Sequence, residues 1–206
     1  MVASPCLPFA IRCSEGGAAE SLEDRRVKLD LHTHCREATA CPTPTVEIAR
    51  RIVAVVRARG LDGIGITEHY TKAYGYAVKR IVEEELHEEL LVIPGQEIDR
   101  LAMGIGKGMM HVVELYLPGD LVFRFIAHPG HPYVVDLESL IDGSIHGIEL
   151  RNANHDGRID EGVVRELARK HDLLLLANSD AHSLEAIGTH YNEIGIEELC
   201  ARAGAL

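Results

Sequence analysis

Two histidines, at positions 32 and 34, end the short run KLDLHTH at residues 28–34. Side chains two positions apart on a strand point to the same side, so both imidazoles can face one point beyond the strand's end. Imidazole nitrogens bind zinc, manganese and iron, and a single strand holds both rings in place. An HxH pattern also occurs by chance, but here several later strand-like runs also end in His, Asp or Glu. That repetition points to a metal site.

The residues that carry this pattern lie where predicted strands begin or end. They are His32, His34, His69, Glu97, His111, His128, Asp180 and His182. A single four- or five-coordinate ion uses three or four protein ligands, so this set fits two or three ions that share a carboxylate. Glu97 stands midway in the order and is the natural bridge.

Alternating strands and helices must position these residues. Apolar residues at helical spacing predict a helix from Pro44 that stops at Gly60, and with the strands 28–34 and 61–67 this makes a parallel βαβ unit. A glycine-rich loop, 104–108, lacks the Lys-Ser/Thr ending of a P-loop. Further helices are predicted at about 77–89 and 162–170, and further strands at 90–98, 111–117, 122–127, 147–152, 173–178 and 191–196.

This alternation predicts an α/β fold, which an open doubly wound sheet or a barrel would satisfy. The barrel is favoured because its strand ends converge on one pocket, whereas an open sheet spreads them along a line. The chain of 206 residues fits one domain. Residues 1–26 lack the basic and apolar regions of a signal peptide, and we expect an irregular extension there.

Composition limits the partners. A formal charge of −11, 4% aromatic residues and no Trp weigh weakly against nonspecific nucleic-acid binding. The five cysteines form no CxxC pair, which favours a reducing, cytoplasmic compartment. No apolar run approaches the roughly 20 residues that span a bilayer, so no membrane partner is expected. The oligomeric state cannot be read from the sequence.

The motifs, taken in order, resemble those of the PHP (polymerase and histidinol phosphatase) family. The likeness covers about residues 28–196 and rests on DLHTH at 30–34, GITEH at 65–69, GQE at 95–97, His111, AHP at 127–129 and NSDAH at 178–182. The resemblance implies a distorted seven-stranded β/α barrel over residues 27–206. It also implies a two- or three-metal site on the barrel's C-terminal face and hydrolysis of phosphate esters, with metal-bound hydroxide as the nucleophile.

Carried over residue by residue, the resemblance gives three ion sites. The first is held by His32, His34, Glu97 and Asp180, the second by Glu97, His111 and His128, and the third by His69 and His182. Glu97, Asp180 and His182 are the expected catalytic residues, with His182 or the third ion assisting the leaving oxygen.

Two departures from the family pattern bear on this site. Relatives often carry a further His or Asp five to seven residues after the second motif histidine. CREATAC occupies 35–41 here, so Glu37 or Cys41 takes that place, or no residue does. Glu68 stands where many relatives have Asp, and we expect it to orient a ligand.

Phosphate capture beyond the metals usually needs Arg or Lys. Arg151 is the first candidate, followed by Lys72 and Lys107. The roles of His131, His155 and His190 are left open by the sequence.

Three functions remain open at this point. The first is a phosphoesterase that uses two or three zinc, manganese or iron ions and acts on a small phosphorylated substrate or a nucleic-acid end. The second is an amidohydrolase-type enzyme acting on C–N or C–O bonds, whose barrel also opens with HxH but typically uses a lysine bridge; no lysine ends a central strand here. The third is a non-catalytic metal-binding regulatory module.

Overall fold

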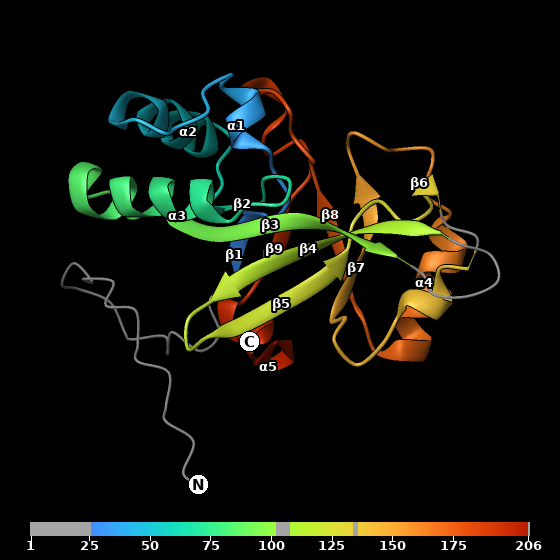
Figure 1. Cartoon of the computed structure of the whole chain (residues 1–206). Coiled ribbons are helices and arrows are strands. Elements are labelled where there is room, and N and C mark those ends of the chain that lie inside the picture. The colour runs from blue at the N-terminus through green and yellow to red at the C-terminus, as the bar shows by residue number, and fades with distance from the viewer. Residues whose placement is uncertain (1–25, 102–107, 134–135, 206) are drawn as a thin grey trace, which may run out of the picture.

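Strand pairing in the computed structural model follows one path around a nearly closed, barrel-like sheet (Figure 1). The structure describes residues 26–101, 108–133 and 136–205. The order of strands is β8 (Leu174–Asn178), β7 (Gly147–Asn152), β5 (Leu121–Ile126), β4 (Met109–Leu117), β3 (Leu91–Leu101), β2 (Gly63–Ile66), β1 (Val27–Asp30) and β9 (Asn192–Ile194). Two short strands, β6 (Pro132–Tyr133) and β10 (Gly204–Ala205), pair with β4 and β5. The barrel-like α/β fold is as predicted.

The expected count of seven strands is wrong, because the path holds eight. The eighth is β9, which pairs antiparallel with β1 through Lys28 and Glu193. The sheet is also mixed: β1, β2 and β3 are parallel, β3, β4 and β5 are antiparallel, and β5, β7 and β8 are parallel again.

β3 is longer than the predicted strand 90–98. Its parallel pairing with β2 ends at Pro94, but its antiparallel pairing with β4 continues to Leu101. Glu97 therefore lies inside a strand and faces its neighbours from the middle of β3, rather than ending a strand.

The strand path ends at β8 on one side and at β9, which pairs with β1, on the other. Side-chain amides of Asn192 in β9 and Asn178 in β8 fill the seam between these two ends. Asn192 accepts a hydrogen bond from the Ala177 amide at 2.8 Å and donates to Asn178 Oδ1 at 2.8 Å. Asn178 Oδ1 in turn accepts from the Leu31 amide at 3.0 Å. Just beyond the strands, the main chain pairs directly, since the Asp180 amide donates to the His32 carbonyl at 2.9 Å. The seam is thus tied at the end that carries the predicted ligands.

Helices cover both outer sides of the sheet (Figure 1). α2 (Val46–Ala58), α3 (Ala73–Arg80) and the π-helical turn η2 (Ile81–Leu86) lie over β2 and β3, α4 (Glu161–His171) lies over β7 and β8, and α5 (Ile196–Arg202) packs on β5. Thr45 caps α2 and Asp160 caps α4 through their side-chain oxygens. The helix predicted at 77–89 begins earlier and ends earlier, with its buried face running from Tyr74 to Val82. The remaining turns are α1 (Cys35–Ala38), η3 (Glu138–Leu140) and η4 (Leu184–Ala186).

Alternation along the strands divides the apolar residues between the barrel interior and the two helical layers. The interior cluster includes Leu29, Leu31, Val113, Phe123 and Phe125. One outer cluster joins α2 and α3 to Ile64, Ile66 and Val92, and the other joins α4 to Met110, Ile126 and Ile148. This period-two pattern is the one expected of strands buried on both faces.

Several predictions fall on residues outside those described. They are the irregular extension, apart from Arg26, and most of the loop 104–108 with Lys107. Among the described helices, none has the length and apolar character needed to cross a bilayer.

Candidate metal centre

All eight predicted ligands converge at one end of the barrel, although they come from six separate stretches of the chain. His32 and His34 follow β1, His69 follows β2, Glu97 lies in β3, His111 lies near the start of β4, His128 follows β5, and Asp180 and His182 follow β8. Because β4 is antiparallel to β3, its first residues lie at the same end of the barrel as the ends of the parallel strands. The topology therefore explains how a residue at a strand start joins residues at strand ends.

His32, His34, Glu97 and Asp180 form the tightest group. The two histidine Nε2 atoms lie 3.2 Å apart. Glu97 oxygens lie 3.6 Å from Nε2 of His32 and 3.5 Å from Nε2 of His34, and Asp180 Oδ1 lies 3.5 and 3.1 Å from the same two nitrogens. Zinc bonds of about 2.0–2.1 Å in a tetrahedral site place ligand atoms roughly 3.3 Å apart. The two histidine nitrogens therefore lie at about this spacing from each other and from an oxygen of each carboxylate.

A second group shares Glu97. Its Oε1 lies 2.9 Å from His111 Nδ1 and 3.1 Å from His128 Nε2. Asp99 Oδ1 lies 3.3 Å from Nε2 of His111, and Asp99 Oδ2 accepts a 2.6 Å hydrogen bond from the Tyr70 hydroxyl. One carboxylate therefore contacts ligands of two neighbouring groups, as a bridge must.

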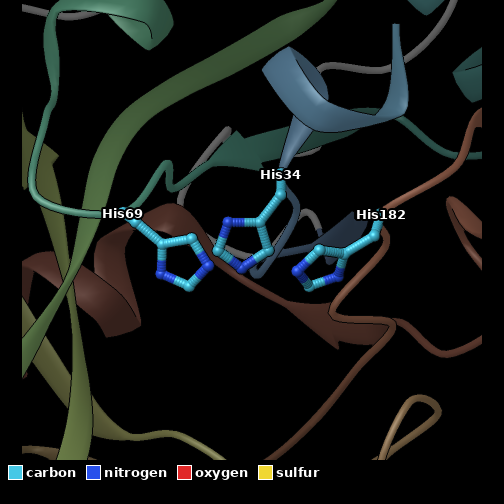
Figure 2. A group of neighbouring side chains, drawn as sticks. All are labelled: His34, His69 and His182. Atoms are coloured by element: carbon cyan, nitrogen blue, oxygen red, sulfur yellow. The ribbon is translucent and has the colours of Figure 1, made fainter. Parts of the chain in front are cut away.

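The third group consists of His34, His69 and His182, whose rings lie side by side at the ends of β1, β2 and β8 (Figure 2). The ring centroid of His34 lies 4.3 Å from that of His69 and 4.4 Å from that of His182. Glu37 oxygens lie 3.9 Å from His69 Nε2 and 3.7 Å from His182 Nε2. Of the two alternatives for the missing family ligand, Glu37 is thus the one beside this group. Cys41 instead donates to the Thr43 carbonyl and packs against the cluster of α2.

Hydrogen bonds hold three of the rings with Nε2 toward the centre. Nδ1 of each ring lies next to an oxygen that can only accept a hydrogen bond, so Nδ1 must carry the proton. The oxygen belongs to Glu149 beside His32 (3.0 Å), to the His131 carbonyl beside His128 (3.2 Å) and to the Asp180 carbonyl beside His182 (2.8 Å). In a neutral ring the proton on Nδ1 leaves a lone pair on Nε2. Nδ1 of His34 is buried without a hydrogen-bond partner among the described residues. Nitrogen lone pairs beside ionised carboxylates are the donor set that divalent metal ions take, so the cluster fits such ions.

Unusual backbone conformations occur at the ligand positions. His128 has φ 26° and Asp180 has φ 53°, both in the left-handed region that most non-glycine residues avoid. Asp30 anchors the Asp180 segment, since it accepts hydrogen bonds from the Ser179 hydroxyl and from the Ser179 and Gly188 amides. These contacts hold the strained segment against β1.

The close packing of imidazoles and carboxylates in a buried site shifts the pKa values of its carboxyl groups. Burial raises the pKa of Glu97, but the neighbouring His32, His111 and His128 outweigh it and hold the pKa well below its ordinary range. The pKa of Asp180 is likewise held low against burial, by His32 and His34. Both carboxylates therefore stay ionised at neutral pH. Burial also raises the pKa of Glu68 to about 7, and its Oε1 accepts from the Arg36 amide rather than from a ligand.

The predicted phosphate-binding residues Arg151 and Lys72 make their contacts outside the cluster of candidate metal ligands. Arg151 directs its guanidinium to Asp156 at 3.3 Å, and Lys72 Nζ lies 4.0 Å from the ring centroid of Tyr116. A β-bulge between Glu149 and Arg151 explains the first placement, because it turns Arg151 outward and brings Asn152 inward. Lys107 lies outside the described residues. A substrate role for any of the three stays a prediction.

Two further residues join the cluster. His155, left open by the sequence, places Nε2 3.4 Å from Asp180 Oδ2 and its ring centroid 4.4 Å from that of His128. Burial and the nearby His128 lower the pKa of His155 to about 4, so it is neutral at pH 7. Glu149 lies behind His32 and was not predicted at all. Neither residue sits in a recognisable motif, and only the fold brings them to the site.

Comparison with known proteins finds one family match and similar solved structures. A family model described as PHP-associated matches residues 161–202, the stretch that contains Asp180 and His182. The fold is similar to that of a protein from Bifidobacterium adolescentis ATCC 15703 provisionally described as a metal-dependent phosphoesterase. The TM-score is 0.66 and the identity 15%, over 86% of this chain and 97% of that one.

A second similar structure is PsfC from Pseudomonas syringae PB-5123, with TM-score 0.59 and 18% identity over 86% of this chain and 88% of that one. No curated protein matches the chain. At these identities the structural likeness establishes the fold, while the ligand cluster itself indicates divalent metal binding.

Proposed function

We propose that this chain belongs to the PHP family and is a metal-dependent hydrolase of phosphate esters. The observation that carries the proposal is Glu97, whose two oxygens lie within 3.6 Å of nitrogens from His32, His34, His69, His111 and His128. A single carboxylate among that many imidazoles fits adjacent cations that share a ligand.

We assign the ligands as follows. His32, His34, Glu97 and Asp180 hold the first ion, and Glu97, His111 and His128 hold the second. His69 and His182, with Glu37 beside them, hold a third. Zinc, manganese and iron all suit this set of imidazoles and carboxylates.

When bound, adjacent divalent ions lower the pKa of a water molecule and offset the charge that develops on a phosphoryl group. The chain itself holds these groups in position. Glu97 and Asp180 stay ionised, which favours cations at the end of the barrel. The side chain of His182 is 37% exposed, so it lies at the rim where a leaving group departs. His182 itself, or the ion that it would help to hold, would assist the leaving oxygen.

The substrate we propose is a small phosphorylated molecule in the cytoplasm, with a nucleic-acid end as the second candidate. Arg151 remains our first candidate for contact with the substrate beyond the phosphoryl group. Because it is paired only with exposed partners, Asp156 and Glu161, a substrate anion can compete for its guanidinium at little cost.

The test is a substrate panel applied to metal-replete protein: an aryl phosphate monoester, a phosphodiester, a lactone and an amide. We expect hydrolysis of the phosphate esters and none of the lactone or the amide. Hydrolysis of the lactone or the amide alone would favour the amidohydrolase reading. Protein that holds metal and hydrolyses nothing on the panel would favour the regulatory module.

A further inference from the structure

Glu149 is fully buried in β7, directly behind the candidate metal centre. Glu149 is not one of the ligands assigned above. Its carboxylate instead bonds two of those ligands, His32 and His128, from behind. Four hydrogen bonds end on its carboxylate. Oε1 accepts from His32 Nδ1 at 3.0 Å and from Asn178 Nδ2 at 2.8 Å, and Oε2 accepts from the His128 amide at 2.7 Å and from Asn152 Nδ2 at 2.7 Å.

All four partners of Glu149 are donors. Two are side-chain amides, one is a main-chain N–H, and the fourth is an imidazole nitrogen that can carry a proton. Only an ionised carboxylate offers an acceptor to all four. A glutamine in this place would turn its NH₂ group toward two donors in either orientation, which leaves buried donors without acceptors. The surroundings of Glu149 are therefore built for a negative charge.

The carboxylate acts on one ligand from each of the first two ion sets. By accepting the Nδ1 proton of His32, it leaves the Nε2 lone pair of that ring facing Glu97 and Asp180. By accepting from the His128 amide, it holds the main chain at φ 26°, the conformation from which His128 reaches Glu97 at 3.1 Å. Asn178, which also bonds Glu149, belongs to the seam with β1.

We propose that Glu149 is a positioning residue for metal binding: it sets the tautomer of His32 and the backbone of His128, and it makes His32 a stronger ligand. The inference rests on the proposed metal centre but not on the reaction catalysed there. A carboxylate behind a metal-binding histidine contributes about 10- to 100-fold to metal affinity. We expect Glu149→Gln to weaken zinc binding by about that factor, although it removes no ligand.

The affinity experiment compares wild type, Glu149→Gln and Glu149→Asp by competition for zinc with a chromophoric chelator. Glu114→Gln is the matched control, because Glu114 is also a buried strand carboxylate with several donors, yet it bonds Arg124, Gln96 and Tyr116 rather than a histidine. We expect Glu114→Gln to bind zinc as wild type does. Glu149→Asp keeps the negative charge on a shorter side chain, so its zinc affinity should lie between those of wild type and Glu149→Gln. Equal affinity in wild type and Glu149→Gln would overturn the inference.

A second measurement needs no variant, in case Glu149→Gln fails to fold. Nitrogen-15 NMR of zinc-loaded wild type should show His32 bound to zinc through Nε2, with a slowly exchanging proton on Nδ1. Zinc bound through Nδ1 of His32, or the lack of that proton, would overturn the inference.

The two proposals fail separately. Wild type that binds zinc and shows the Nδ1 proton but hydrolyses no phosphate ester leaves the role of Glu149 intact and refutes the proposed function. Wild type that binds none of zinc, manganese and iron refutes both.

Discussion

Replacing Glu97 with glutamine removes the negative charge that the first two ion sets share. Glutamine keeps the volume of the side chain and one acceptor oxygen, so β3 can retain its pairing with β2 and β4. What changes is the charge next to five imidazoles, of which His69 and His111 are closest at 3.0 and 2.9 Å. The perturbation is thus electrostatic and lies where two ions would meet.

The size of the effect follows from Coulomb's law. Two unit charges about 4 Å apart interact by about 4 kcal/mol at an effective dielectric constant of 20. Loss of one such interaction raises a dissociation constant by about a thousandfold. Because Glu97 contacts both groups, we expect Glu97→Gln to lose the first and second ions together and to have no measurable turnover.

The assay is elemental analysis of the variant after dialysis, paired with hydrolysis of an aryl phosphate, with Glu114→Gln as the control that keeps its ions. Circular dichroism checks that the fold persists. A folded Glu97→Gln protein that retains two ions and full activity would refute the bridging role of this carboxylate.

Three further predictions concern the rim, the strands and the pH dependence. Glu37→Gln should lose only the ion of His69 and His182, whereas Cys41→Ser should lose none, which metal content per chain measures. Gly65→Ala places a Cβ 2.7 Å from the Leu31 carbonyl, so β1 and β2 must separate, and urea unfolding should show a loss of about 1–3 kcal/mol; unchanged stability would contradict this. Burial raises the pKa of Asp30 to about 6, above its ordinary 3.8, so this carboxyl keeps its proton to a higher pH in the folded metal-free protein than in the unfolded chain. Its contribution to the free energy of unfolding should therefore fall as pH rises from about 4 to about 6, so the free energy of unfolding of wild type minus that of Asp30→Asn should decrease over this range; a difference that increases with pH would contradict the burial argument.

Much of this site is readable from the sequence because most of the candidate ligands directly follow strands. Three of the predicted groups each follow an apolar run: His32 with His34, His69 after β2, and Asp180 with His182 after β8. The structure brings these groups together. Local pattern is sufficient there, since a parallel strand delivers the residues after it to one end of the sheet.

Other features depend on pairing between distant segments. β3 continues beyond Ile98, where the predicted strand ends, because β4 pairs with it antiparallel as far as Leu101, a contact that the composition of 99–101 does not reveal. The bulge after Glu149 reverses the expected faces of Arg151 and Asn152. The strand predicted at 191–196 is present as β9, but its place beside β1 depends on their antiparallel pairing.

The sequence left the role of His155 open and did not indicate Glu149, both for the same reason. His155 follows β7 in a turn, and its position beside Asp180 depends on how that turn folds back over β8. Glu149 sits inside a strand, where a lone acidic residue usually indicates an exposed face. Only the closed sheet turns it inward to meet His32 and His128.

The most direct test of the metal-dependent hydrolase is metal content per chain in protein purified without chelators, paired with aryl phosphate hydrolysis before and after chelation. Two or three ions per chain, with hydrolysis that chelation abolishes and added zinc, manganese or iron restores, is the predicted result. One ion or none, with no hydrolysis after any of these metals is restored, would contradict it.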